Sequence, residues 1–317
     1  MFEKITDFVA HNIPHIFFIS FDKKICEVLT LEEAKKQGIY LKYNPAYNQR
    51  PFLKVDLQPH FMSFNEYKAK FDLIQWHLHR GDTYLLNFTQ KTPISLPFSL
   101  EMLAQKAYGK FIGYWPNRFL FFSPEPFVYI DKFHRIHTYP MKGTSISLND
   151  PDGSKLLSKE KENREHATVV DLLRNDLAIV ARNIEIIQYK YLEKVPLSDH
   201  TFLWQMSTHI QGELDPMWKN KAGDVLNAIL PAGSISGAPK EKTIQIIEKI
   251  EGFDRNFYTG IAGIFNGIEL LTCVMIRFIG VENDKLYYYS GGGITSLSQA
   301  EEEYTEYKNK IYATIAL

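Results

Sequence analysis

Cysteine is nearly absent from this chain, and the cysteines present follow no motif. Among 317 residues there are two, Cys26 and Cys273. They form neither a Cys-x-x-Cys pair nor another spacing typical of zinc ligands. This excludes a disulfide-stapled fold and a cysteine-based metal centre, and we expect two free thiols in a reducing compartment.

Long apolar runs are missing as well. No stretch reaches the length of about 18 apolar residues that a membrane-spanning helix needs. The N-terminal segment carries Glu3, Lys4 and Asp7 and lacks the uninterrupted apolar region of a signal peptide. We therefore expect a cytoplasmic protein with no membrane partner.

Neither sign of charge is in excess. The chain has 36 Lys and Arg against 37 Asp and Glu, a formal net charge of −1. Nothing in this balance indicates nucleic acid as a partner, and local cations would have to hold an anionic substrate. The ten histidines form no metal-binding motif, so we assign none of them to a metal.

Linkers and internal repeats are also lacking, so we expect one domain over residues 1–317. Its 45% hydrophobic content is ample for a large core. Residues 1–75 show no recognisable chemistry.

Hydrophobic periodicity predicts a mixture of helices and strands. The predicted helices are 62–80, 99–109, 159–183, 222–230, 241–251 and 298 to the C-terminus. The predicted strands are 16–19, 25–29, 85–90, 111–114, 119–122, 127–130, 136–139, 184–192, 260–266, 269–279 and 284–290, and the stretches 43–60 and 145–160 are predicted loops. Because the strands come in antiparallel-looking pairs, the pattern favours an α+β fold.

Two of the predicted helices each carry a Glu-x-x-Glu pair, Glu162 with Glu165 and Glu303 with Glu306. Residues three apart lie on one helix face, so each helix can aim two carboxylates at one point. Mg²⁺ prefers oxygen ligands and often combines one or two protein carboxylates with substrate oxygens. The pairs are candidate magnesium ligands, and the alternative is a solvated acidic face.

Four further features could carry chemistry. Lys142, in Pro140-Met141-Lys142-Gly143-Thr144, faces either solvent or a pocket. Arg277 interrupts an apolar strand, where a guanidinium must be paired or face a cleft. The glycines 291–293 offer backbone amides to a carboxylate, although a tight turn explains them equally well. Glu125 follows an aromatic strand, and apolar surroundings would raise its pKa and suit it to act as a general acid.

Together these segments resemble the chorismate-utilising enzymes, from about Gly81 to Lys310. The segments that carry the resemblance are Gly81-Asp82-Thr83-Tyr84, Ser123-Pro124-Glu125, Pro140 to Thr144, Glu165, Val170-Asp171-Leu172-Leu173-Arg174-Asn175-Asp176, Gly233 to Lys240, Tyr258-Thr259-Gly260, Ile276-Arg277, Gly291 to Gly293 and Glu303 to Lys310. The resemblance implies two large facing antiparallel sheets with helices outside and an active site in the cleft between them.

The resemblance also implies roles for individual residues. It implies Mg²⁺ at the ring carboxylate of chorismate, with Glu165 and Glu306 as inner ligands and Glu162 and Glu303 in support. The implied substrate contacts are Thr144, Ser236, Arg277, Gly292, Gly293 and Lys310. Glu125 resembles the general acid that helps to expel the C4 hydroxyl.

Lys142 distinguishes branches of this family. Anthranilate, isochorismate and salicylate synthases usually have a small residue in this position, whereas aminodeoxychorismate synthases typically have lysine. In that branch the amine is thought to attack ring C2 as the C4 hydroxyl leaves, and ammonia then adds at C4 and expels the lysine. Leu85 stands where the water-adding branch has a lysine base. The resemblance therefore implies an aminodeoxychorismate synthase component I.

Two residues depart from the family pattern. Most members have glutamine at the position of Leu85, and Gln205 stands where a histidine is usual. Neither cysteine lies in a glutaminase motif, so the expected ammonia source is a separate glutamine amidotransferase subunit. The alternatives are anthranilate synthase component I and a non-catalytic chorismate-binding subunit.

Overall fold

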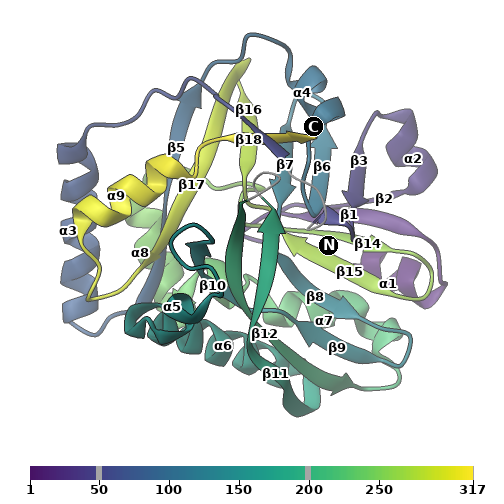
Figure 1. Ribbon diagram of the computed structural model, residues 1–317. Helices are drawn as coiled ribbons and strands as arrows, with labels where there is room; N and C mark the ends of the chain where they lie inside the picture. The colour runs from purple at the N-terminus through teal and green to yellow at the C-terminus, as the bar shows by residue number, and fades with distance from the viewer. Residues whose placement is uncertain (48–51, 197–200, 317) are drawn as a thin grey trace.

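The structure, a computed structural model, describes residues 1–47, 52–196 and 201–316. Two large sheets form its frame, and helices cover their outer faces (Figure 1). Strand pairing within the described residues is antiparallel throughout. The predicted α+β class with two antiparallel sheets is confirmed.

The larger sheet has nine strands within the described part of the chain. Their order is β10-β12-β9-β8-β15-β14-β1-β2, and β11 also pairs with β12. The bounds are β1 (His15–Ile19), β2 (Cys26–Thr30), β8 (Pro126–Ile130), β9 (Arg135–Thr138), β10 (Met141–Ile146), β11 (Ala181–Pro196), β12 (Phe202–Leu214), β14 (Ile261–Phe265) and β15 (Leu270–Val274). Lys142 lies on β10.

The smaller sheet has seven strands among the described residues, in the order β13-β5-β17-β16-β7-β6-β3, and β18 forms a separate pair with β4. The bounds are β3 (Tyr40–Tyr43), β4 (Phe52–Val55), β5 (Leu85–Ile94), β6 (Phe111–Trp115), β7 (Phe119–Ser123), β13 (Gly237–Ala238), β16 (Phe278–Glu282), β17 (Lys285–Ile294) and β18 (Ala313–Ala316).

Three of the helices, α2, α3 and α4, begin at a side-chain cap that the sequence supplies. Capping boxes, in which a hydroxyl and a glutamate satisfy free backbone amides, start α2 at Thr30 and α3 at Ser63. The bounds are α1 (Glu3–Ala10), α2 (Leu31–Lys36), α3 (Phe64–His79), α4 (Leu100–Lys106), α5 (Ser154–Ser158), α6 (Glu160–Val180), α7 (Ala222–Ile229), α8 (Lys240–Glu251) and α9 (Ala300–Asn309), with short 3₁₀ turns η2 (Trp218–Lys221) and η3 (Gly233–Ile235).

Three apolar layers hold the sheets and helices together. The first packs α1, α6 and α7 against the larger sheet. The second packs α3, α8 and α9 against the smaller sheet. The third lies between the sheets and is rich in aromatic side chains, among them Phe18, Phe119 and Phe121, all fully buried. As a result, α6 is fixed to one sheet and α9 to the other.

Four local predictions were wrong. The stretch 43–60 is not all loop, because it contains β4. The last helix ends at Asn309, and the chain returns as β18 to pair with β4. The predicted strand 269–279 is broken at Arg277, whose φ of 52° no extended strand accommodates. The stretch 145–160 is not all loop either, because it contains α5. For the glycines 291–293 a tight turn was one of two alternatives left open, and all three pair with β5 inside β17.

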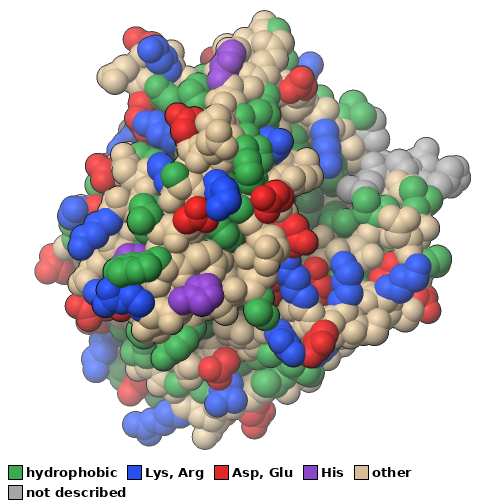
Figure 2. Space-filling view, turned by 90° about the vertical axis from the view of Figure 1, so that its left-hand side faces the viewer, with side chains coloured by type: hydrophobic (Ala, Val, Ile, Leu, Met, Phe, Trp, Pro, Cys, Tyr) green, Lys and Arg blue, Asp and Glu red, His purple; other side chains and the backbone are tan. Residues whose placement is uncertain are grey.

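The face of the molecule that Figure 2 shows is charged but mixed in sign. Figure 2, which views the molecule from the left-hand side of Figure 1, shows Lys and Arg interspersed with Asp and Glu. Within the described residues, no helix is long and apolar enough to cross a membrane.

Candidate functional site

Lys142 lies on β10 and faces the helix α6. Its Nζ is 3.5 Å from a carboxylate oxygen of Glu165, and both side chains are largely shielded from solvent. Of the two alternatives for Lys142, solvent or a pocket, the structure therefore supports the pocket. The lysine that follows Met141 lies inside a group of acidic side chains.

Gly143 permits this close approach of strand and helix. Its φ is 82°, in the left-handed region that glycine adopts without strain. A Cβ at this position would lie 3.0 Å from Oε2 of Glu162. The glycine after Lys142 thus brings the first Glu-x-x-Glu pair against the strand.

The second pair, on α9, lies over the glycine run of β17. A Cβ on Gly292 would be 3.1 Å from Oε1 of Glu306 and 3.6 Å from Oε2 of Glu303. Lys310 forms a 2.6 Å ion pair with Glu306 and donates a hydrogen bond to the carbonyl oxygen of Gly291 at 2.7 Å. The bare backbone therefore supplies room for this acidic pair.

Gly293 joins the two halves of the site. A Cβ there would lie 3.6 Å from Nζ of Lys142 and 3.1 Å from the side chain of Leu85. The structure thus brings together Lys142, Gly292, Gly293, Lys310 and all four predicted glutamates. We call this group the acidic cluster.

The crowding of negative charge shifts the pKa values of the glutamates in the acidic cluster. Burial and repulsion from Glu165 raise the pKa of Glu162, and burial and repulsion from Glu306 raise the pKa of Glu303. Burial opposes ionisation of Glu306 too, but Lys310 outweighs it and the pKa of Glu306 is lowered. Crowded carboxylates of this kind favour a cation between them.

The two lysines respond in opposite directions. Burial lowers the pKa of Lys142, but attraction to Glu165, Glu306 and Glu303 outweighs it, so the net pKa is raised. For Lys310, burial dominates and the pKa is lowered. Lys142 is thus held as an ammonium by its neighbours.

Arg277 reaches the cluster from the junction of the two sheets. It lies between β15 of the larger sheet and β16 of the smaller one. Its Nη1 donates to the carbonyl oxygen of Lys310 at 2.9 Å, and its guanidinium lies 5.0 Å from the ring centre of Tyr312. The strand break directs this cation toward the end of α9.

Glu125, the predicted general acid, is partly buried after β7. Burial raises the pKa of Glu125, although a hydrogen bond from Ser234 and the charges of Lys142 and Lys310 act against the rise. Ser234 Oγ donates to Oε1 of Glu125 at 2.8 Å. The contact of Ser234 with Glu125 was not predicted, because the two residues lie far apart in the sequence and no motif joins them.

The loop that carries Ser234 is fastened at both ends. The N–H of Gly233 donates to Oδ2 of Asp176 at 2.9 Å, and Lys240 forms a 2.7 Å ion pair with the other oxygen of the same carboxylate. Ser236 is fully buried and donates its hydroxyl to the carbonyl oxygen of Ala232. The hydroxyl of Ser236 is therefore engaged within its own loop.

Three other polar residues of the region lie as follows. The side chain of Thr144 is exposed, and among the described residues no hydrogen bond joins it to the acidic cluster. Gln205 donates from Nε2 to the sulfur of Met141 at 2.7 Å. His166, next to Glu165, is fully buried, and burial lowers its pKa to about 4. This neutral histidine was not predicted from the sequence.

A separate cavity of about 480 Å³ lies nearby. Tyrosines line much of it, and its link to the cluster is Met141, the neighbour of Lys142. Among the residues that the structure describes, none of the four glutamates lines it. The cavity and the acidic cluster are distinct features.

The sequence that builds this site matches a known protein family. A model of the chorismate binding enzymes matches residues 19–316. An uncharacterized PabA-like protein of Haemophilus influenzae is 43% identical, covering 99% of this chain and 96% of that protein. Aminodeoxychorismate synthase component 1 of Escherichia coli is 30% identical over 79% of this chain and 57% of its own length.

A solved structure shows the same fold. Anthranilate synthase component I from Streptococcus pneumoniae superimposes with a TM-score of 0.71 at 20% identity, covering 96% of this chain and 84% of that one. The family match extends over nearly the whole chain and includes every residue of the acidic cluster. The chain therefore belongs to the chorismate-binding enzyme family.

Proposed function

We propose that this chain is the chorismate-aminating component of aminodeoxychorismate synthase. It would convert chorismate and ammonia to 4-amino-4-deoxychorismate and water. The observation that carries the proposal is the place of Lys142, beside Glu165 and against Gly293. The aminating branch of the family typically has a lysine at this position. The 30% identity to aminodeoxychorismate synthase component 1 of Escherichia coli also supports amination as the reaction.

In the proposed reaction Lys142 acts as a nucleophile. Its amine forms a bond to ring C2, the two conjugated double bonds of the ring shift toward C4, and the C4–O bond breaks with loss of the hydroxyl, which leaves as water after taking a proton. Ammonia then forms a bond to C4, the double bond shifts back, and the C2–N bond to Lys142 breaks. The attack requires a neutral amine, whereas the neighbouring glutamates favour the ammonium, so proton removal precedes it.

Glu125 supplies the proton for the departing hydroxyl in this proposal. Its raised pKa keeps a proton available at higher pH than an exposed glutamate would. Ser234 fixes the orientation of the carboxyl through the 2.8 Å hydrogen bond. The pair therefore combines a tuned acid with a positioning group.

The four glutamates fit a Mg²⁺ ion. They are oxygen donors of the kind that Mg²⁺ prefers, and like-charge repulsion within each pair favours a bound cation. No three acidic, histidine or cysteine side chains of the described residues already converge in coordinating geometry. When bound, the ion would neutralise charge at the ring carboxylate of the substrate.

The cations around the cluster suit the carboxylates of chorismate. Arg277 contacts the backbone of Lys310 and the hydroxyl of Tyr288, and its five N–H groups leave further donors for a planar carboxylate. Lys310 adds a second positive charge beside Gly292. We propose Thr144 and the amides of Gly292 and Gly293 as further contacts, and Ser236 as a support of its loop.

Ammonia is the second substrate in this proposal. We propose a separate glutamine amidotransferase subunit as its physiological source. Ammonium salt at high concentration should replace that subunit in the test tube.

Product analysis tests the proposal. The chain is incubated with chorismate, Mg²⁺ and ammonium salt, and the products are separated by chromatography with mass detection. We expect 4-amino-4-deoxychorismate, and Lys142→Ala should abolish it while chorismate still binds. Fluorescent anthranilate would instead identify an anthranilate synthase, and no loss of chorismate would indicate a non-catalytic subunit.

A further inference from the structure

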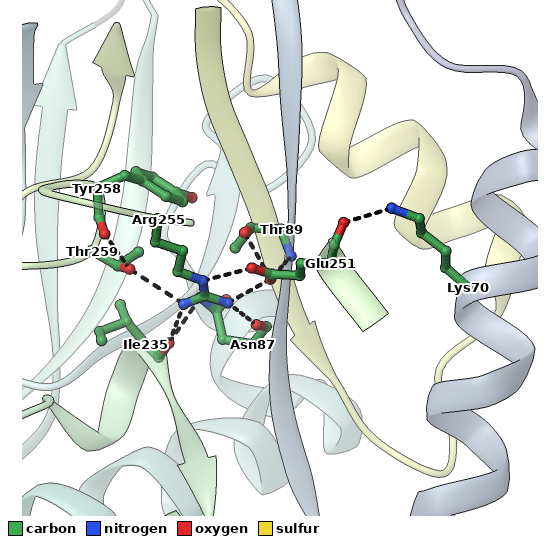
Figure 3. Close-up of polar contacts among 8 residues, drawn as sticks. All are labelled: Lys70, Asn87, Thr89, Ile235, Glu251, Arg255, Tyr258 and Thr259. Carbon is green, nitrogen blue, oxygen red and sulfur yellow. Dashed lines mark hydrogen bonds and ion pairs between the residues drawn. The ribbon is translucent and has the colours of Figure 1, made fainter. Parts of the chain in front are cut away.

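A buried polar network outside the acidic cluster centres on Arg255 (Figure 3). The side chains of Arg255 and Glu251 are 2% and 1% exposed. Nε of Arg255 donates to Oε2 of Glu251 at 2.8 Å, and Nη2 donates to Oε1 at 2.6 Å. A buried ion pair adds little net stability over apolar side chains of the same volume, because desolvation offsets the attraction. Stability alone is thus a weak explanation for this pair.

The other donors of Arg255 hold the loop that carries Ser234. Nη1 donates to the carbonyl oxygen of Ile235 at 3.0 Å, and Nη2 donates to that of Asn87 at 2.6 Å. Asn87 in turn donates from Nδ2 to Ile235 at 3.1 Å and from its N–H to the carbonyl oxygen of Ser236 at 2.9 Å. The carbonyl group of Ile235, the residue after Ser234, is therefore held from two directions.

Glu251 fixes the guanidinium relative to the smaller sheet. Its Oε1 accepts hydrogen bonds from both the N–H and the hydroxyl of Thr89, each 2.8 Å long. Thr89 lies on β5 opposite Gly291 of the glycine run. Through these bonds the position of Ile235 is tied to the strand that borders the acidic cluster.

We propose that Arg255 is a positioning residue, which holds Ile235 so that the hydroxyl of Ser234 meets the carboxyl of Glu125. This inference rests on the proposed function in one respect, the acid role of Glu125. Arg255 acts through the loop and does not touch the reacting groups. Loosening the loop should weaken the donation from Ser234 and change the acidity of Glu125.

The charged and titratable groups facing Glu125 give the direction of that change. They are Lys142 on β10, Lys310 after α9 and the thiol of Cys273 on β15, whose pKa is raised by burial and further by Glu125. The hydrogen bond from Ser234 lowers the pKa of Glu125. Losing that bond should raise this pKa, so the alkaline limb of kcat should move to higher pH.

Three variants separate positioning from simple stability. Arg255→Lys keeps a charge for Glu251 but loses the fork that reaches Ile235 and Asn87. Ser234→Ala removes the final hydroxyl without disturbing a buried charge. Lys70→Ala is the matched control, because Lys70 donates to the backbone oxygen of Glu251 at 2.8 Å on the side away from the loop.

Chorismate consumption is measured against pH at saturating Mg²⁺ and ammonium, with melting curves for each variant. We expect Arg255→Lys and Ser234→Ala to lose about tenfold in kcat with little change in KM, as small misplacements of catalytic groups do. In both variants the alkaline limb of the pH profile of kcat should shift to higher pH, and Lys70→Ala should behave as the parent. Loss of activity only in proportion to the unfolded fraction, with an unshifted limb, would overturn the proposal.

A second measurement keeps the inference separate from the proposed function. The rate of chorismate loss does not depend on product identity, so anthranilate formation would refute the function and leave this test intact. A ¹³C-NMR titration of the Glu125 carboxyl, assigned with Glu125→Gln, needs no turnover. An unchanged Glu125 titration in Arg255→Lys would again overturn the positioning role.

Discussion

Removing the ammonium of Lys142 should strengthen Mg²⁺ binding in the absence of chorismate. Nζ of Lys142 lies 3.5 Å from Glu165, and Glu306 and Glu303 also stabilise its charge. A divalent cation at these carboxylates would compete with the ammonium. Lys142→Ala removes the competitor and leaves the oxygen donors in place.

The size of the effect follows from the distance. At 3.5 Å and an effective dielectric constant of about 20, one unit charge pair has a gross attraction of about 5 kcal/mol. Most of this is offset because the separated groups regain solvation. A remainder of about 1–2 kcal/mol corresponds to a Mg²⁺ dissociation constant about 5- to 30-fold lower in the variant.

Calorimetric titration of Mg²⁺ into the apoprotein measures this directly. Lys36→Ala is the matched control, since Lys36 forms a 2.7 Å pair with Glu32 on α2, which carries no residue of the acidic cluster, and the two side chains are 73% and 76% exposed. Pairs so exposed contribute little, and we expect at most a twofold change there by the same principle. Equal or weaker Mg²⁺ binding by Lys142→Ala would show that the ammonium does not compete for these carboxylates.

Three further variants test other parts of the site. Burial raises the pKa of Glu125, so the folded protein keeps a proton that the unfolded chain releases above about pH 4.3. The free energy of unfolding therefore falls as the pH rises from the pKa of the unfolded chain to the higher pKa of the folded protein. Urea unfolding at pH 5 and pH 8 should show a smaller loss of this free energy for Glu125→Gln than for the parent. Gly143→Ala should cost roughly 1–2 kcal/mol, because φ is 82°, with an added clash at Glu162; denaturant unfolding measures it. Arg277→Lys loses the hydrogen bond to Lys310 and should raise KM for chorismate about tenfold, the equivalent of about 1.5 kcal/mol, in steady-state kinetics.

Each of these variants has an outcome that would contradict its reasoning. For Glu125→Gln it is an unaltered pH dependence of stability. A Gly143→Ala protein as stable as the parent would mean that β10 adjusts its backbone freely. An unchanged KM in Arg277→Lys would remove this arginine from the substrate contacts.

The acidic pairs could be predicted from the sequence because their spacing is local. Glu162 and Glu165 share a helix face by geometry alone, and so do Glu303 and Glu306. Their meeting across the two sheets rests on pairings between strands far apart in the chain, such as β5 with β17. Only the family resemblance anticipated that meeting.

The predictions that failed were those decided by tertiary contacts. Arg277 reads as a strand residue because its neighbours are apolar, yet a positive φ there lets the chain pass from one sheet to the other. For the glycine run the sequence left a turn and a carboxylate-binding backbone both open, and its pairing with β5 keeps it extended. Ser234 and Arg255 carried no local signal, since their partners lie in other segments.

The attachment of α6 and α9 to different sheets has a mechanical consequence. The distance between the two pairs of carboxylates depends on how the two sheets pack, and the aromatic layer between the sheets is part of that packing. A Cβ on Gly113 of β6, for example, would lie 2.2 Å from the ring of Phe121, its partner on β7 of the same sheet, so this ring of the aromatic layer would have to move. If both pairs hold one ion, as proposed, we expect the ionic radius that they accept to respond to such changes of hydrocarbon packing between the sheets.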